Sequence, residues 1–389
     1  MNKSIFRRTY YDAIIIGARC AGSATGLELA RTGASVLLVD RDHPGNDTLS
    51  THALMRPAIA LLNDWGVIPE IEKSGTPLVT ATTFHYGGEK IPVAVKPGGD
   101  IKGLYAPRRN VLDQVLADAA VAAGAEMHTG VSFLAATKDA AGRVRGALLA
   151  TSEGKQIPVS CGILIGADGR QSAVAHQVGA ATQIESQERT AVVYGYFKGL
   201  PNEGYRWFFG HNSYSGAIPT NDGAHCVFAG VRPDRFKGMM GSDPLKGMRA
   251  VLSECDPDLA EHLRIGPVDG KLRRYGGAFG HMRECAGPGW ALVGDAGYFK
   301  DPVTAHGITD ALLDAHRLVH ALQSDLSFPM VYQQERNAKS AGMFEITRKI
   351  AALNSNYDTL KSLHQDLNQI MKTELAELRT PRLAPVIAA

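Results

Sequence analysis

The chain has 389 residues, enough for one large domain or two of medium size. Hydrophobic residues make up 44% and charged residues 21%, a balance that excludes a disordered chain. Forty-one basic side chains against 39 acidic ones give a net charge of +2, which excludes nucleic-acid binding by bulk charge. We therefore expect a globular protein whose main partner is a small molecule.

Cysteine usage and hydropathy indicate the compartment. Five cysteines, at positions 20, 161, 226, 255 and 285, are widely spaced and form no CxxC pair. This pattern predicts neither a disulfide framework nor a metal site, and it favours a reducing cytoplasm. No apolar run reaches the ~18–20 residues of a membrane-spanning helix, so stable membrane insertion is not expected.

The first 40 residues contain a complete strand–helix–strand unit. Tyr11 to Ile16 (YDAIII) is a short apolar run rich in β-branched residues, which predicts a buried parallel strand. Gly22 to Arg31 predicts a helix, closed by Gly33, and Ser35 to Val39 (SVLLV) predicts a second buried strand. This order and length are typical of a βαβ unit that binds a nucleotide.

Further elements follow along the chain. Apolar periodicity predicts helices over residues 57–65, 109–123, 243–263, 308–323 and 329–378. Short apolar or alternating runs predict a strand pair over 127–149, buried strands at 161–166 and 289–293, and an antiparallel sheet over 190–231.

The loop after the first strand carries a nucleotide fingerprint. Gly17-Ala18-Arg19-Cys20-Ala21-Gly22 matches GxGxxG at its first and third glycines, with Arg19 in the middle position. Gly17 permits the tight turn, Gly22 permits close packing of the helix, and the helix N-terminus offers free N–H groups to a pyrophosphate. Asp40 ends the second strand, where a carboxylate would accept hydrogen bonds from a ribose.

Two more motifs follow predicted strands. Residues 162–166 lead into Ala167-Asp168-Gly169-Arg170, and residues 290–293 lead into Gly294-Asp295-Ala296-Gly297 and then Asp301-Pro302-Val303-Thr304-Ala305-His306-Gly307-Ile308. With three such motifs in this order, the chain resembles the flavoprotein monooxygenases of the p-hydroxybenzoate hydroxylase fold. Their superfamily includes flavin-dependent halogenases and geranylgeranyl reductases. The resemblance covers about residues 10–350 and implies FAD as cofactor.

The resemblance implies a role for each motif. Asp295 would bind the ribityl hydroxyls, although an Asp there could also be only a helix N-cap. Pro302 would lie against the isoalloxazine ring, and Arg109 would contact FAD unless it is merely a solvated first-turn arginine. The full set of expected FAD-binding residues is Gly17, Arg19, Cys20, Ala21, Gly22, Asp40, Arg41, Ser50, Arg109, Val131, Asp168, Gly294, Asp295, Pro302, Gly307 and Ile308.

The fold class expected is α/β. It comprises a Rossmann-like, glutathione-reductase-type FAD domain built from residues 1–70, 100–180 and 280–325. An antiparallel-sheet substrate domain, residues 71–99 and 181–279, is inserted into it, and residues 326–389 form a C-terminal helical region. The chain has no second GxGxxG motif, so NADH or NADPH would dock transiently as reductant. A homodimer and a separate flavin reductase partner both stay open.

The predicted class of reaction depends on the residues that stand where related enzymes carry a tryptophan motif. Halogenases carry WxWxIP and geranylgeranyl reductases carry something like YxWxFP, whereas this chain has Tyr214-Ser215-Gly216-Ala217-Ile218-Pro219. Glycine at position 216 predicts an open passage between flavin and substrate, which favours direct oxygen transfer. The resulting hypothesis is hydroxylation of an aromatic or polycyclic molecule through a C4a-hydroperoxyflavin. A reductase or dehydrogenase of the geranylgeranyl-reductase type is the alternative, a halogenase is a third, and a flavin carrier without turnover is the non-enzymatic one.

The sequence offers fewer candidates for substrate binding and catalysis than for FAD binding. Aromatic residues gather in the antiparallel segment, which predicts an aromatic-lined pocket or else ordinary sheet packing. The expected substrate contacts are Tyr194, Tyr196, Trp207, Tyr214, Gly216 and Pro219. His52 and His306 lie in loops expected to border the flavin and are the candidate acid–base residues.

Overall fold

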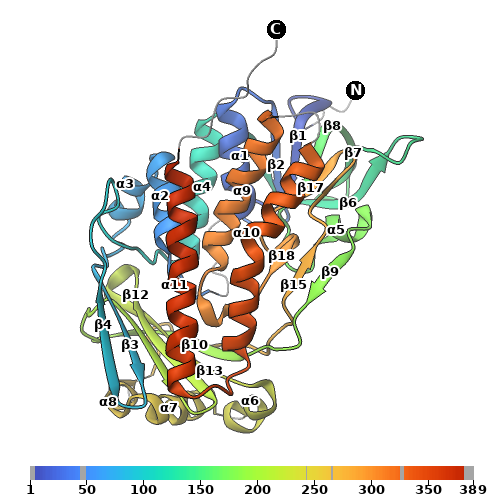
Figure 1. Cartoon of the computed structure of the whole chain (residues 1–389). Coiled ribbons are helices and arrows are strands. Elements are labelled where there is room, and N and C mark those ends of the chain that lie inside the picture. The colour runs from blue at the N-terminus through green and yellow to red at the C-terminus, as the bar shows by residue number, and fades with distance from the viewer. Residues whose placement is uncertain (1–4, 44–49, 242, 264–265, 325–327, 381–389) are drawn as a thin grey trace.

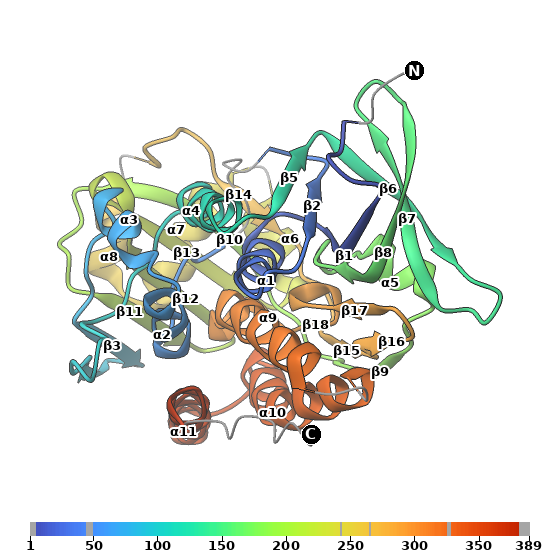
Figure 2. The same cartoon turned by 90° about the horizontal axis from the view of Figure 1, so that it is seen from above.

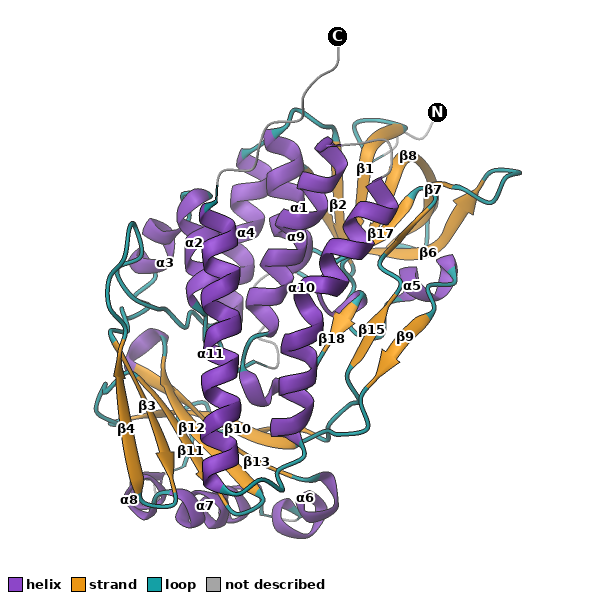
Figure 3. Ribbon diagram, in the orientation of Figure 1, coloured by secondary structure: helices purple, strands orange, loops and turns teal. Residues whose placement is uncertain are grey.

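Two large sheets organise the chain. The structure, a computed structural model, describes residues 5–43, 50–241, 243–263, 266–324 and 328–380. Figure 3 shows the two groups of strands at opposite ends of the molecule, with long helices running between and beside them. The fold is the predicted α/β arrangement, in which an FAD-type βαβ sheet is combined with a mainly antiparallel sheet and C-terminal helices.

The first sheet has eight strands around a parallel core. The path β16-β17-β8-β1-β2-β5 continues from β8 through β7 to β6. Strand β1 lies between two parallel neighbours, β2 and β8, in the centre of the sheet, and Ile14 and Ile15 are fully buried. The strands are β1 (Tyr10–Ile16), β2 (Val36–Asp40), β5 (Glu126–Thr129), β6 (Val131–Lys138), β7 (Val144–Thr151), β8 (Gln156–Gly166), β16 (Ala286–Gly287) and β17 (Trp290–Leu292).

Helices cover this sheet and lead out of its strands. Helix α1 (Cys20–Arg31) packs against α4 (Arg109–Ala122) and α9 (Gly307–Ser324), as Figure 2 shows from above. Shorter helices complete this part: α2 (Arg56–Asp64), α3 (Ile68–Lys73) and α5 (Ala173–Val178). A small sheet of three strands lies beside it: β9 (Thr182–Glu185), β15 (His281–Arg283) and β18 (Tyr298–Phe299).

The second sheet has seven strands in the order β14-β10-β13-β12-β11-β3-β4. All neighbours are antiparallel except β3 and β11, which run parallel. Three helices pack on the face turned away from the first sheet, around their own apolar cluster: α6 (Pro233–Met240), α7 (Pro244–Cys255) and α8 (Pro257–His262). The strands are β3 (Ala81–Tyr86), β4 (Glu89–Ala94), β10 (Ala191–Lys198), β11 (Tyr205–Gly210), β12 (Ser213–Pro219), β13 (Ala224–Val231) and β14 (Arg273–Tyr275).

Two predicted helices are each divided in the structure. The helix expected over 243–263 is α7 and α8, because Pro257 cannot continue α7 and the Asp256 side chain caps α8 instead. The helical tail is α10 (Phe328–Ala351) and α11 (Tyr357–Arg379), separated near Leu353, whose φ of 52° is left-handed. Helix α6 lies in a stretch for which the sequence predicted no element. The predicted domain boundaries stay a prediction.

Helix α11 joins the two ends of the molecule. In Figure 1 it runs in red from α2 to the strands of the second sheet. Arg379 pairs with Asp64 of α2 at 3.1 Å, and the hydroxyl of Tyr86 on β3 lies 2.7 Å from Nδ1 of His364 on α11. The C-terminal helix therefore fixes the second sheet relative to the first.

Candidate functional site

A cavity of about 690 Å³ lies between the strand-end loops of the first sheet and one face of the second. The loops that follow β1, β2 and β8 and the segment from η3 (Gly294–Ala296) to α9 contribute one side. Residues of β10, β12, β13 and β14 contribute the other. Strand ends of a parallel sheet are where α/β proteins bind nucleotides, and this volume is in the usual range for ligand sites.

The glycines of the fingerprint are required by close backbone contacts. Gly17 has a φ of 102°, and a Cβ added to it would lie 2.4 Å from the carbonyl oxygen of Ala167. A Cβ on Gly22 would lie 1.7 Å from the carbonyl oxygen of Gly17. The loop after β1 therefore packs directly on α1 and on the loop after β8, as a pyrophosphate-binding turn needs.

Acidic and basic side chains surround this turn. Asp40 Oδ2 accepts a hydrogen bond from the backbone N–H of Ala18 at 2.8 Å, so the carboxylate at the end of β2 is held beside the glycine turn. The guanidinium of Arg19 lies 3.6 Å from Asp42 Oδ2, and both residues are half-exposed at the cavity. The arrangement fits a ribose next to a pyrophosphate.

Arg109 is held inside the site. Its side chain is only 13% exposed, and Nη2 lies 2.9 Å and 3.0 Å from the two carboxylate oxygens of Asp113. The alternative of a solvated first-turn arginine is therefore wrong. Cys20 Sγ lies 3.0 Å from the same Asp113 carboxylate, and burial raises the pKa of the thiol.

Asp295 faces the cavity with its carboxylate unengaged by the described protein groups. It lies within η3, whose N-cap is Val293, so the N-cap alternative is also wrong. Burial raises the pKa of Asp295, and the cations of Lys300, Arg109 and Arg170 oppose that effect. A ligand bearing hydroxyl donors would satisfy this carboxylate, as the ribityl chain of FAD does.

Asp168 lines the cavity and also hydrogen-bonds to the start of α5. Its carboxylate accepts hydrogen bonds from Ser172 Oγ at 2.5 Å and from the N–H of Val174 at 3.1 Å. Burial raises the pKa of Asp168. The carboxylate thus binds the first turn of α5 and its N-cap, Ser172, and its contact with a ligand stays a prediction.

Most of the expected FAD-binding residues come together on this one cavity. Gly22 and Gly294 do not line it, and they support its walls from behind. The predicted residues that do line it are Gly17, Arg19, Cys20, Ala21, Asp40, Arg41, Ser50, Arg109, Val131, Asp168, Asp295, Pro302, Gly307 and Ile308. The glycine turn, the two carboxylates and the volume fit FAD.

The predicted substrate residues divide into two groups. Tyr194 and Tyr214 line the cavity beside Pro302. The others lie outside its described wall: Tyr196, Trp207, Gly216 and Pro219. Tyr196 instead bonds His52, with 2.6 Å between its hydroxyl and Nε2 of the histidine.

Neither predicted catalytic histidine lines the cavity within the described chain. His52 is fully buried, with a strained φ of 66°, and His306 is 1% exposed. Neither ring borders the cavity, and an acid–base role for either histidine stays a prediction.

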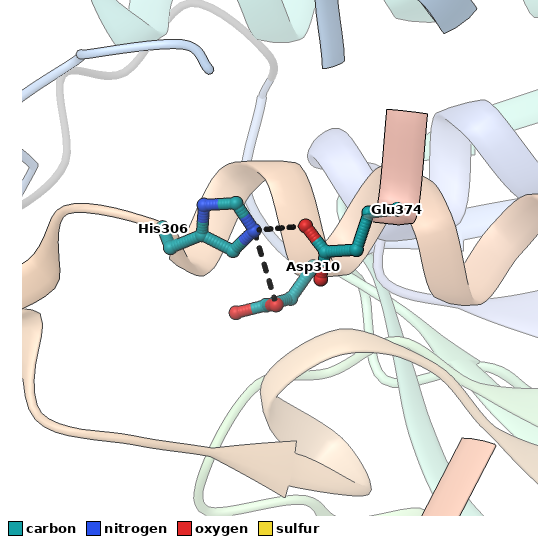
Figure 4. A group of neighbouring side chains, drawn as sticks. All are labelled: His306, Asp310 and Glu374. Atoms are coloured by element: carbon teal, nitrogen blue, oxygen red, sulfur yellow. Dashed lines mark hydrogen bonds and ion pairs between the residues drawn. The ribbon is translucent and has the colours of Figure 1, made fainter. Parts of the chain in front are cut away.

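His306 belongs to a buried ionic cluster at the start of α9. Its Nε2 lies 3.0 Å from Glu374 Oε2 on α11 and 3.8 Å from Asp310 Oδ1 on α9, as Figure 4 shows. The three ligand-type atoms lie within 4.8 Å of one another. However, the ammonium of Lys300 already contacts Asp310, so a cation balances this carboxylate without a metal ion. The cluster ties α11 to the helix that begins at the cavity.

The space at Gly216 is filled, which corrects one expectation. Gly216 pairs with Phe228 across β12 and β13, and a Cβ on Gly216 would lie 2.3 Å from the Phe228 ring. Next to this pair, the ring of Tyr214 packs over Gly230 in the same way. Phe228 and Tyr214 both line the cavity, so aromatic rings stand beside Gly216 where open space was expected.

Gly216→Ala should destabilise the protein, because the new methyl group would overlap the Phe228 ring. We expect a loss of ~1–3 kcal/mol in the free energy of unfolding, measured by urea denaturation, and partial recovery in Gly216→Ala/Phe228→Leu. Gly238→Ala is the control, since a Cβ on Gly238 in α6 meets nothing within 4 Å. A Gly216→Ala protein as stable as Gly238→Ala would contradict the packing described here.

Sequence reasoning missed several lining residues. Phe228, Tyr275, Lys300 and Asp301 all border the cavity. Asp301 stood in a recognised motif, next to Pro302. Phe228 and Tyr275 depend on strand register, which a single sequence does not reveal.

Comparison with known proteins agrees with this geometry. Residues 10–226 match the family model described as FAD binding domain, and the chain belongs to that family. It is therefore an FAD-dependent oxidoreductase of the p-hydroxybenzoate hydroxylase fold.

One curated relative is digeranylgeranylglycerophospholipid reductase 2 of Methanothermobacter thermautotrophicus, 28% identical over 307 residues, which cover 77% of this chain and 74% of the relative. One similar solved structure is the flavin-dependent brominase Bmp2, which has a TM-score of 0.78, 19% identity and coverage of 95% of this chain and 99% of that one. Another is PqsL of Pseudomonas aeruginosa, a probable FAD-dependent monooxygenase. PqsL has a TM-score of 0.75, 16% identity and coverage of 93% and 100%. Among the described residues, no helix is long and apolar enough to cross a membrane.

Proposed function

We propose that this chain is an FAD-dependent reductase that saturates carbon–carbon double bonds in an apolar, isoprenoid-type substrate. The observation that carries the proposal is the pair of aromatic rings, Tyr214 and Phe228, that lines the cavity opposite the FAD-binding loops. The kinship with a digeranylgeranylglycerophospholipid reductase supports the same reading.

Hydroxylation was the leading expectation from the sequence. It was expected because Gly216 would leave an open passage to the flavin, but the ring of Phe228 occupies the space beside Gly216. Likeness to PqsL and to the brominase supports the fold alone, and both tryptophans of the halogenase motif are absent. A reductase, the alternative expected from the sequence, therefore fits the aromatic lining better.

The chain's own residues would bind and orient the reactants. The glycine turn at Gly17 and the carboxylates of Asp40 and Asp295 would hold FAD, which supplies a hydride once reduced. Aromatic side chains would bury the apolar substrate next to Pro302 and exclude water. The reductant, NADH or NADPH, with or without a separate flavin reductase, stays a prediction.

The test begins with purified protein, which we expect to be yellow and to contain FAD. After anaerobic reduction with dithionite, a phospholipid carrying geranylgeranyl chains, dispersed in detergent, should reoxidise the flavin. Mass spectrometry should show two hydrogens gained per double bond. Colourless protein that stays so in excess FAD would contradict the cofactor assignment. Aerobic incorporation of an atom of O₂ into product, without double-bond saturation, would favour the monooxygenase instead.

A further inference from the structure

Three polar side chains form a hydrogen-bonded chain along the cavity wall. Thr190 Oγ1 lies 2.8 Å from Asp301 Oδ1 and 2.9 Å from the hydroxyl oxygen of Tyr214. Asp301 and Tyr214 both line the cavity, and Thr190 is fully buried behind them. The residues at both ends of this hydrogen-bonded triad thus line the cavity, while the middle residue is sheltered from water.

The two ends differ in acidity. Asp301 accepts hydrogen bonds from the N–H groups of Thr190 at 2.6 Å and Val303 at 3.0 Å, yet burial raises the pKa of Asp301 to about 6. Burial also raises the pKa of Tyr214 well above its ordinary value. Tyr214 alone is therefore a weak proton donor, whereas Asp301 can carry a releasable proton near neutral pH.

The position of these three hydrogen-bonded side chains suggests that they pass a proton toward the substrate. Asp301 directly precedes Pro302, which the family resemblance places against the flavin ring, and Tyr214 stands in the aromatic wall on the substrate side. A proton passed along the chain would arrive where the substrate must lie.

We propose that Tyr214 is the acid that delivers a proton to the substrate when a double bond is saturated, and that Thr190 and Asp301 resupply it. The inference rests on the proposed function, because saturation adds one hydride and one proton across the double bond.

The hydride and the protons move in one concerted step. One alkene carbon accepts the hydride with its two electrons, which reduced FAD would supply and by which it would be oxidised. The other carbon takes the proton of the Tyr214 hydroxyl as its O–H bond breaks. The Thr190 hydroxyl gives its proton to Tyr214, and the Asp301 carboxyl gives its proton to Thr190. Asp301 ends as a carboxylate, which takes a new proton from solvent between turnovers. Because the transfers are concerted, no free phenolate forms, and the group that has lost a proton at the end of the step is Asp301.

Tyr214→Phe is the first test, since it removes only the hydroxyl and keeps the ring that packs over Gly230. The measurement is the single-turnover reoxidation rate of the dithionite-reduced enzyme by the geranylgeranyl phospholipid, in H₂O and in D₂O. We expect the rate to fall ~100-fold, with unchanged FAD affinity and flavin absorbance spectrum. Tyr86→Phe is the matched control, because that hydroxyl bonds His364 away from the cavity, and its rate should equal that of the wild type.

The buried link supplies a second test by rescue. Thr190→Val keeps the shape but removes the hydroxyl, and should slow reoxidation and alter the solvent isotope effect. Thr190→Ser restores the hydroxyl and should recover most of the rate. A purely structural role for Thr190 would leave the isotope effect unmoved in both variants.

The pH profile tests Asp301. The titratable groups that face it in the described structure are Tyr214 on β12 and Tyr275 on β14, and burial raises the pKa of Tyr275 to about 12, so neither ionises near neutrality. The wild-type rate should fall as pH rises through about 6, where Asp301 loses its proton, and Asp301→Asn should be slow with a flat profile.

The possible results distinguish a failure of the proton-transfer proposal from a failure of the proposed reductase function. If the reduced wild-type enzyme saturates no double bond of the probe, the proposed function fails and the proton chain falls with it. If the wild type saturates the probe but Tyr214→Phe keeps the wild-type rate and isotope effect, the proton chain alone is overturned.

Discussion

Gly22→Ala is expected to yield protein with little or no bound FAD. The added methyl carbon would lie 1.7 Å from the carbonyl oxygen of Gly17 and 3.2 Å from Cβ of Ala167. Both neighbours belong to loops that surround the predicted pyrophosphate site, and a backbone carbonyl cannot move aside as a flexible side chain can. We expect FAD affinity to fall at least ~100-fold and the free energy of unfolding to fall by ~1–3 kcal/mol or more.

A matched control lies one turn further along the same helix. A Cβ on Gly26 would make ordinary contacts of 3.6 Å with Ile15 and 3.7 Å with Leu38. Gly26→Ala should therefore keep its FAD and gain up to ~1 kcal/mol, because alanine is the better helix former. Flavin absorbance per protein and fluorescence titration with FAD measure both variants. Full FAD content in Gly22→Ala would show that the glycine turn does not hold the cofactor.

Local signals predicted the nucleotide half of the site well. The strand, glycine turn, helix and Asp40 are contiguous in the sequence, and each step follows from short-range rules of backbone geometry. The loops carrying Asp168 and Asp295 each follow a buried strand of the same parallel sheet, and Pro302 comes seven residues after Asp295. Their convergence on one cavity follows from the fold class itself.

The substrate half depends on register, which the sequence does not contain. Whether Gly216 opens a passage depends on the residue opposite it, and Phe228 lies opposite only because β12 and β13 pair as they do. A shift of one residue would turn these side chains to the other face. The same limit explains why Tyr196 and Trp207 were expected at the cavity although they lie outside its wall.

Long-range polar contacts were also beyond prediction. The C-terminal region reads as helical with a polar exposed face, yet Arg336 of α10 is completely buried. Its guanidinium donates to the backbone carbonyl of Gly297 at 2.8 Å through Nη1 and to that of Arg283 through Nη2. A single sequence gives no sign that this arginine, among the many in the chain, turns inward.

Arg336→Met should therefore be among the most damaging substitutions outside the cavity. Methionine keeps much of the length but removes the donors to both carbonyls, and it leaves the buried Asp314 without one of the cations that oppose the rise in its pKa. We expect a loss of ~3–5 kcal/mol in the free energy of unfolding, measured by urea denaturation of the FAD-free protein.

The consequence should reach the cofactor, since Gly297 ends the turn that presents Asp295 to the cavity. FAD affinity, measured by fluorescence titration under native conditions, should fall together with stability. Arg348→Met is the control on the same helix. Arg348 pairs with Glu345 at 2.7 Å, but the two side chains are 38% and 46% exposed, so its loss should cost less than ~1 kcal/mol and leave FAD binding intact. Equal stability of the two variants would mean that the contacts of Arg336 with the turn contribute little, and that α9 and the first sheet alone hold Asp295 in place.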